Sequence, residues 1–249
     1  MEAAPARDPH GPLFFVHVMK TGGSTFAVRL KRELGRESVF PYFGIDPVEV
    51  MTNLSVGYLT SQPLERLNQV RAFAGHYPFF AARLVPTPSL VLTILRDPVE
   101  RAISHLKQHR REKGQESRSL EDIYERGFAR PLYIDNFQVR VFALTEADGA
   151  DDVQQPIEID DRRMSIAKEH LEEVDILGLT DHHAEFVAEV VRRLGWSNRG
   201  VGNQRVSEPV EVPSSLRQKL IQDNEADREF YAFARDLYER RRRRGSVVV

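Results

Sequence analysis

One short segment combines the residue types that bind a phosphate group: Lys20, Thr21, Gly22, Gly23, Ser24 and Thr25. It follows an apolar, β-branched run and precedes apolar residues at helical intervals, which predicts a turn between a strand and a helix. Free backbone N–H groups and the helix dipole concentrate positive potential there. The glycines let an anion approach, the hydroxyls can donate hydrogen bonds, and Lys20 adds a charge. A structural turn with an exposed lysine explains the segment equally well.

A second candidate anion site follows the most apolar run of the chain, residues 89–95. Arg96 comes directly after this run, at the strand end where open α/β sheets bind ligands. Asp97 as N-cap and Pro98 as first helical residue start a helix that places Ser104 about two turns along it. Arg96 and Ser104 can then face one phosphate. The structural alternative is a helix cap in which Arg96 and Arg101 pair with Asp97 and Glu100.

The remaining polar candidates indicate structure more than chemistry. His105 and His109 have the i, i+4 spacing of metal ligands, but a solvated helix face explains them better because no third ligand accompanies them. His17 lies inside a predicted strand and is expected to be packed, and His182-His183 resembles a helix start. Arg140 can meet an anionic acceptor or form a structural salt bridge.

The elements around these residues alternate between strand and helix. Strands are predicted at 13–18, 71–75, 89–95 and 176–179, and the run 89–95 is expected to be covered on both faces. Helices are predicted at 24–34, 63–70, 98–111, 120–126, 136–144, 164–174 and 186–194, and from Pro213 through Tyr238. Residues 40–58 indicate loops with a short helix, and 146–155 a mobile loop. The pattern predicts one three-layer α/β domain at 13–239 with a mainly parallel sheet, a flexible tail at 1–12 and a basic tail at 240–249.

Composition narrows the chemistry further. The 249 residues carry a formal charge of −2, so no global basic field attracts a polyanion and any anion must be bound locally. The chain has no cysteine, which excludes thiol nucleophiles, disulfides and cysteine-ligated metals. Neither a signal core nor a membrane-length apolar run is present, and we expect a cytoplasmic protein.

The two anion elements together resemble those of sulfotransferases that use 3′-phosphoadenosine-5′-phosphosulfate (PAPS). Residues 16–25 resemble the 5′-phosphosulfate loop of that family, and residues 95–104 resemble its 3′-phosphate motif. The resemblance is closest to carbohydrate sulfotransferases of the heparan sulfate 2-O-sulfotransferase type and their bacterial relatives. It continues through four further segments: 75–79, 135–140, 178–181 and Asn224 to Asp227. Met19 stands where proline is usual, and His105 and Leu106 replace aromatic residues, which blurs the subfamily.

The resemblance implies a P-loop-like sulfotransferase fold and a set of site residues. Residues 20–25 would hold the 5′-phosphosulfate, Arg96 and Ser104 the 3′-phosphate, and Asn203 and Arg205 would close a loop over the nucleotide. His76 would be the base that accepts the acceptor's proton, and Lys20 would stabilise the leaving group. The structural alternative for His76 is a turn histidine bonded to backbone. The donor would be PAPS, the product adenosine 3′,5′-bisphosphate, and no metal would be needed. The implied acceptor is a hydroxyl of a sugar or glycoconjugate.

Three other functions stay open at this point. A nucleotide kinase or phosphotransferase with a phosphate loop is disfavoured because Lys20 precedes the glycines instead of following them. A nucleic-acid-binding module could use the run Arg240 to Arg244, but the rest of the chain is net acidic and no nucleic-acid partner is expected. A sulfotransferase-like protein that binds without catalysing is the third. The sequence does not indicate an oligomeric state.

Overall fold

A computed structural model describes residues 10–41, 54–115, 117–126, 130–196 and 211–246. Its centre is a five-stranded sheet in the order β2-β3-β1-β4-β5, and every neighbouring pair is parallel. The strands are β1 (Leu13–Val16), β2 (Val39–Phe40), β3 (Ala72–Phe73), β4 (Leu90–Leu95) and β5 (Ile176–Leu179). The predicted α/β class with a mainly parallel sheet is confirmed.

Side chains of the two central strands alternate between two separate apolar clusters. Phe14 and Val16 of β1, with Val91 and Leu95 of β4, belong to one cluster. Phe15 of β1, with Leu92 and Ile94 of β4, belongs to the other. Because successive strand residues point to opposite faces, the sheet is buried on both sides, as the unbroken apolar run in β4 predicts.

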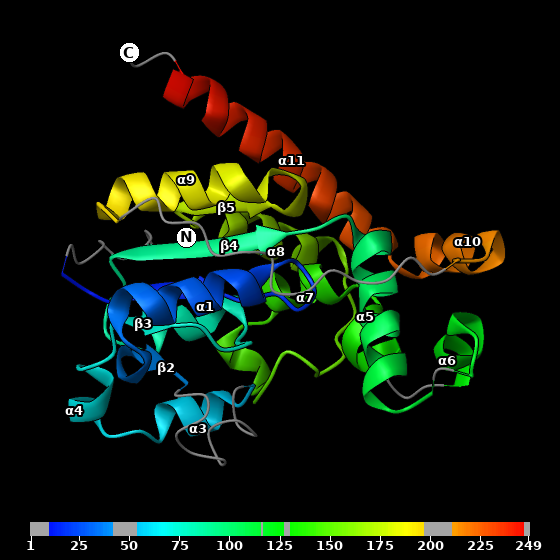
Figure 1. The fold of residues 1–249 in the computed structure, drawn as a ribbon, viewed down its shortest axis with the longest axis horizontal. Coiled ribbons are helices and arrows are strands. Elements are labelled where there is room, and N and C mark those ends of the chain that lie inside the picture. Colours follow the sequence, from blue (N-terminus) through cyan, green and yellow to red (C-terminus); the bar gives the residue numbers. More distant parts are fainter. Residues whose placement is uncertain (1–9, 42–53, 116, 127–129, 197–210, 247–249) are drawn as a thin grey trace.

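Helices cover both faces and one end of the sheet (Figure 1). One face packs against α1 (Gly23–Leu34) and α9 (His183–Leu194), through residues such as Phe26 and Phe186. The other packs against α7 (Phe137–Ala143), α8 (Asp161–Glu172) and α11 (Glu225–Ser246). A third cluster joins α5 (Pro98–Glu112), α6 (Leu120–Arg126) and α10 (Ser214–Asp223). In Figure 1 these three helices lie at the end toward which β4 points. Two short helices, α3 (Val56–Thr60) and α4 (Leu64–Leu67), complete the set.

The structure corrects one local prediction: Val39–Phe40 pairs with Ala72–Phe73 as a strand, although residues 40–58 indicated loops. The helix predicted at 24–34 begins at Gly23, and its N-cap Gly22 makes no side-chain hydrogen bond. The loop at 146–155 contacts its surroundings, because Arg163 forms an ion pair with Asp148, and Asp151 accepts a hydrogen bond from the Ser55 hydroxyl. Its mobility stays a prediction.

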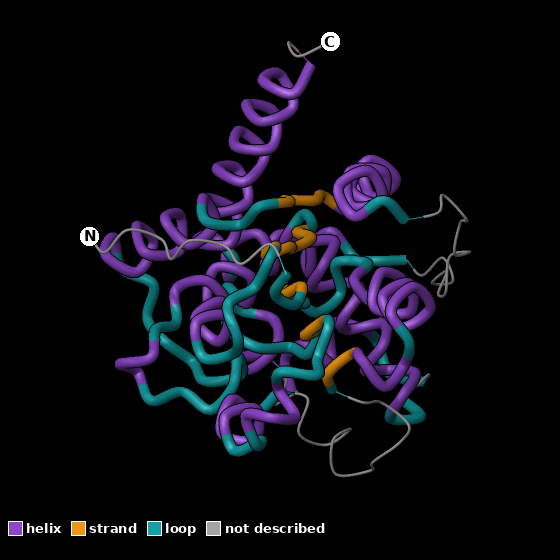
Figure 2. Tube along the Cα trace, turned by 90° about the vertical axis from the view of Figure 1, so that its left-hand side faces the viewer, coloured by secondary structure: helices purple, strands orange, loops and turns teal. Residues whose placement is uncertain are grey.

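The arginine run does not leave the domain as a separate tail. Helix α11 continues through it to Ser246, as Figure 2 shows for the long helix that leads to the C-terminus. Arg241 donates to the carbonyls of Val174 (2.6 Å) and Glu172 (2.8 Å), and Arg242 lies 3.2 Å from Glu185. These intramolecular contacts engage part of the charge that a nucleic-acid site would use. The domain boundaries themselves stay a prediction.

Candidate functional site

The loop between β1 and α1 is tightly wound. Lys20 has a φ of 69° and Gly22 a φ of 89°, both in the left-handed region. The Thr21 side chain is fully buried, and its hydroxyl donates to the Val18 carbonyl at 2.9 Å. Gly23 lies against His17: a Cβ at Gly23 would be 2.3 Å from the His17 Cδ2 atom, which no real Cβ tolerates. Thr21 and Gly23 therefore shape the loop, while Lys20, Gly22, Ser24 and Thr25 face outward.

Arg96 is fixed through its backbone by one buried amide. The Gln138 side chain accepts from the Arg96 N–H (3.0 Å) and donates to the Arg96 carbonyl (2.8 Å), as a neighbouring strand would. The Arg96 guanidinium then donates to the Lys20 carbonyl at 3.2 Å. Arg96 does not pair with Asp97, and Arg101 donates to the Ile134 carbonyl instead of an acidic neighbour. The structural alternative for this motif is wrong, although Asp97 does cap α5 as predicted.

Gln138 is in turn held by the start of α11. Asp227, fully buried, accepts from the backbone N–H groups of Gln138 (3.1 Å) and Val139 (2.7 Å). Asn136 and Asn224 complete the junction: each side-chain carbonyl accepts from a backbone N–H across the two helices, at 3.0 Å. Segments 135–140 and 224–227 thus form one buried hydrogen-bond network behind Arg96. They position the candidate site and do not line it.

Thr180, at the end of β5, connects both anion elements. Its hydroxyl lies 2.8 Å from the Thr21 carbonyl and 3.1 Å from the Leu95 carbonyl. The carboxyl ends of β1, β4 and β5 are therefore fixed relative to one another. In an open α/β sheet this is the edge at which ligands bind.

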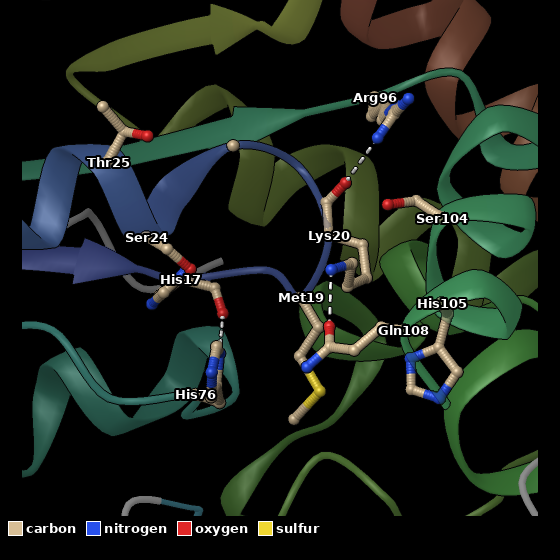
Figure 3. A pocket seen from close by; sticks show the side chains of 11 residues that line it. His17, Met19, Lys20, Ser24, Thr25, His76, Arg96, Ser104, His105 and Gln108 are labelled. Carbon is tan, nitrogen blue, oxygen red and sulfur yellow. Dashed lines mark hydrogen bonds between the residues drawn. The ribbon is translucent and has the colours of Figure 1, made fainter. Parts of the chain in front are cut away.

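A cavity of about 450 Å³ opens at this edge of the sheet. Its lining combines both predicted anion elements with three histidines (Figure 3): His17, Met19, Lys20, Gly22, Ser24, Thr25, His76, Arg96, Ser104, His105 and Gln108. The volume falls within the range of about 300–1,000 Å³ typical of small-molecule pockets. Residues far apart in the sequence are thus brought to one site, although their individual roles stay predictions.

The His76 ring is oriented by the backbone carbonyl of His17, the residue that directly follows β1. Its Nδ1 atom lies 2.6 Å from the His17 carbonyl, and because a carbonyl can only accept, Nδ1 carries the proton. The Nε2 lone pair is then the basic position. Burial lowers the pKa of His76 below its ordinary value of 6.5, the hydrogen bond to His17 opposes this effect, and the Lys20 charge adds to it. His76 is accordingly neutral near pH 7.

His17 contributes more than the packing that the sequence predicts. Its ring is stacked on Phe15 and lies 4.2 Å from the His76 ring, centroid to centroid. Burial, and then the neighbouring His76, lowers its pKa well below 6.5, so this imidazole is also neutral. Strand alternation alone gives no signal for its place at the cavity, because His17 follows the last strand residue.

Helix α5 adds two lining residues that sequence reasoning missed, His105 and Gln108. The Gln108 amide accepts a hydrogen bond from Lys20 Nζ (Figure 3). Its nitrogen donates one to Glu112. Gln108 follows Ser104 by four residues, so the helical period would have placed both on one face. The sequence favoured a solvated helix face for His105 and His109 over a pair of metal ligands. His105 instead lines the cavity, His109 does not, and the described residues contain no cluster of metal ligands.

Two predicted site residues are not tested by the structure, and the interpretation of Arg140 is corrected by it. Asn203 and Arg205 lie outside the described residues. Arg140 is almost fully buried and donates to the carbonyls of Pro131 (2.6 Å) and Leu132 (2.7 Å). The interpretation of Arg140 as an acceptor-binding residue is wrong, because its guanidinium binds backbone instead.

Charge in the cavity is one-sided. Lys20 and Arg96 are the permanent cations of the described lining, and none of its residues is acidic. Together with the loop at the start of α1 and the Ser104 hydroxyl, they can bind an anion with two separated charged groups.

None of the described helices is long and apolar enough to cross a membrane.

Comparison with known proteins gives a likeness in structure but none in sequence. No family model and no curated protein matches the sequence. The fold is similar to the crystal structure of a sulfotransferase from Alicyclobacillus acidocaldarius, with 15% sequence identity and a TM-score of 0.44. The match covers 91% of this chain and 95% of that one.

Proposed function

We propose that this protein is a PAPS-dependent sulfotransferase that transfers a sulfuryl group to a hydroxyl of an acceptor. The observation that carries the proposal is the cavity at the carboxyl edge of the sheet. Both anion elements and His76 line it together, although each was singled out separately in the sequence. A donor with a 5′-phosphosulfate and a 3′-phosphate has two charged ends, which suits two anion sites in one cavity.

Each end of the donor has candidate partners. Lys20, Ser24, Thr25 and the backbone at Gly22 and Gly23 would hold the phosphosulfate at the start of α1. Arg96 and Ser104 would hold the 3′-phosphate, the guanidinium by its planar fork and the serine by its hydroxyl. The buried Gln138 amide fixes the Arg96 backbone, so this part of the site is formed before ligand arrives.

PAPS would supply the sulfuryl group, and the chain would supply base, orientation and charge. The acceptor oxygen forms the new bond to sulfur while the bond from sulfur to the bridging oxygen breaks. The electron pair of that bond stays on the 5′-phosphate, where Lys20 stabilises it. The acceptor's proton passes to Nε2 of His76, whose Nδ1–H is already committed to the His17 carbonyl. The acceptor is a hydroxyl compound, with a sugar or glycoconjugate implied by the resemblance.

Calorimetry with adenosine 3′,5′-bisphosphate tests the donor assignment directly. We expect binding without a divalent metal, and weaker binding of adenosine 5′-phosphate, which lacks the 3′ group. A charge-assisted contact is worth about 1.5–3 kcal/mol, so the difference should be about 10-fold or more. Absence of binding by the bisphosphate, or tighter binding of ATP with magnesium, would reject the proposal and favour a phosphotransferase.

Two variants test separately which residues bind the 3′ end and the 5′ end of the nucleotide. Arg96→Ala should weaken the bisphosphate about 10-fold or more and leave the 5′-monophosphate nearly unchanged. Lys20→Ala should weaken both ligands, because both carry the 5′ group. Equal losses for the two ligands in Arg96→Ala would show that Arg96 does not hold the 3′-phosphate.

A further inference from the structure

One side of the cavity would not contact the phosphosulfate or the 3′-phosphate of the donor. The polar side chains on that side are uncharged. In Figure 3, His76, Met19, Gln108 and His105 lie on the opposite side of Lys20 from Arg96. Burial lowers the pKa of both histidines, that of His105 to about 3, so both imidazoles are neutral near pH 7. Lys20 and Arg96, the permanent cations of the described lining, would be occupied by the donor's own anions.

His105 has hydrogen-bonding capacity that the described residues do not use. Its Nδ1 atom is buried and has no hydrogen-bond partner among them. A buried polar atom of this kind costs free energy unless a ligand or solvent satisfies it. Figure 3 shows the imidazole edge of His105 turned toward the Gln108 side of the cavity, next to Ser104 on the same helix.

The position of this imidazole is fixed by the structure around it. Its ring is stacked on Tyr133, with centroids 5.1 Å apart and an interplanar angle of 17°. Tyr133 belongs to a π-helical turn, Arg130–Ile134. Two buried arginines hold that turn by its carbonyls: Arg140 binds those of Pro131 and Leu132, and Arg101 binds that of Ile134 at 2.9 Å. Tyr133 therefore presents a fixed face, and His105 is held on it.

We propose that His105 is a specificity-determining residue that binds the acceptor and selects an uncharged, hydroxyl-bearing ring. Its free nitrogen would hydrogen-bond a hydroxyl beside the one that receives the sulfuryl group. A carboxylate on the same ring would meet no cation besides Lys20 and Arg96 among the described lining residues and would be repelled by the bound donor. The inference rests on the proposed sulfuryl transfer and adds the class of acceptor and the residue that chooses it.

The test uses the full chain, radiolabelled PAPS and a panel of p-nitrophenyl glycosides. The panel contains the glucoside, galactoside, mannoside and N-acetylglucosaminide, with the glucuronide as the carboxylate-bearing counterpart of the glucoside. We expect at least one neutral glycoside to be sulfated, and the glucuronide to have a kcat/KM about 10-fold or more below that of the glucoside. In His105→Phe, which keeps the stacking on Tyr133, the acceptor kcat/KM should fall about 10-fold or more, mainly through KM.

Two further variants and one binding measurement make the result specific. His105→Asn, which restores a hydrogen-bonding group, should recover part of the loss. His109→Phe, one turn along the same helix and outside the cavity lining, should behave as wild type. The dissociation constant of adenosine 3′,5′-bisphosphate should be the same in all of them, because His105 acts on the acceptor.

The inference is overturned by unchanged acceptor kinetics in His105→Phe, by preference for the glucuronide, or by a panel in which no neutral glycoside is sulfated. In each of these cases intact binding of the bisphosphate leaves the proposed function standing. Loss of bisphosphate binding in the wild-type protein rejects the proposed function and this inference together.

Discussion

A single hydrogen bond decides which nitrogen of His76 is available as a base. Because the His17 carbonyl accepts from Nδ1 at 2.6 Å, Nε2 is left with its lone pair. The partner is a neutral carbonyl and not a carboxylate, so it orients the ring without stabilising the imidazolium as strongly as a negative charge would. Burial then keeps the imidazole in its neutral form.

The pH dependence of transfer follows from this environment. Burial lowers the pKa of His76 below 6.5, so the base form is fully present near pH 7 and is lost only as pH falls further. We expect kcat/KM for an acceptor to be flat around neutrality and to decline with a midpoint below 6.5. A rate profile from pH 5 to pH 8 measures it, and a midpoint above 6.5 would contradict the assignment.

Replacing His76 separates chemistry from nucleotide binding. In His76→Ala we expect turnover to fall about 10²–10⁴-fold, since the acceptor loses its base. The affinity for adenosine 3′,5′-bisphosphate should change little, because in the proposed site its charged groups would bind at Lys20 and Arg96. His182→Ala, at a histidine outside the cavity lining, serves as control. Retained turnover in His76→Ala would show that another group accepts the proton.

The sequence identified those cavity-lining residues that lie beside a recognisable local pattern, and it missed those that do not. Lys20, Arg96 and Ser104 could be found because glycines, a strand end and a helix cap surround them. His17 and His105 could not, because their places at the cavity depend on the packing of β1 against residue 76 and of α5 against a π-helical turn. Such contacts join residues that are distant in the sequence and leave no periodic pattern.

Among the elements, the junction of α7 and α11 determines how Arg96 is held. Buried polar groups form hydrogen bonds with one another across this junction. The Gln138 side chain in turn binds the backbone of Arg96, the residue after β4. Removing one partner of such a network leaves buried backbone groups without hydrogen bonds. The cost should appear both in stability and in ligand affinity.

Gln138→Leu tests this connection. We expect a loss of about 1–3 kcal/mol in the free energy of unfolding, since the Arg96 N–H and carbonyl lose their partner. We also expect adenosine 3′,5′-bisphosphate to bind about 10-fold more weakly, because the guanidinium is no longer held in place. Gln69→Leu, at an exposed position, is the matched control. Unchanged affinity in a destabilised Gln138→Leu would show that Arg96 is positioned without this amide.

Element prediction succeeded where apolar runs were long. The run at 89–95 and the shorter ones at 13–18 and 176–179 became β4, β1 and β5. Strand β2 has two residues, too few to show any period, and its pairing depends on β3. Helix α1 begins at Gly23, one residue before the predicted 24–34, with the left-handed Gly22 as its N-cap.

In the whole molecule, the low net charge of −2 hides a strongly uneven distribution. Cations gather at the cavity, while many acidic side chains elsewhere form ion pairs. Asp148 is one of these: hydrogen bonds from Arg163, and then from Thr145, lower its pKa to about 2. The pair joins the segment after α7 to the first turn of α8, so it contributes to the stability of the domain as a whole.

Acid should remove this contribution in a defined range. The folded-state pKa of Asp148 lies below its ordinary 3.8, so the contribution is complete above about pH 5 and fades as pH falls toward 2. We expect Asp148→Asn to lower the free energy of unfolding by about 1–2 kcal/mol at pH 7. Urea unfolding of both proteins from pH 7 to pH 3 should show this gap narrowing below pH 4. A gap that stays constant with pH would contradict the assignment.

The buried junction between Asn136, Gln138, Asn224 and Asp227 also affects the order in which the protein can be completed during synthesis. All five strands precede residue 180, so the sheet can assemble while α11 is still inside the ribosome. The Gln138 side chain bonds the Arg96 backbone, and the Gln138 backbone N–H is bonded by Asp227 of α11. The hydrogen bonds that position Arg96 can therefore all form only after α11 has been synthesised, later than the sheet on which Arg96 lies.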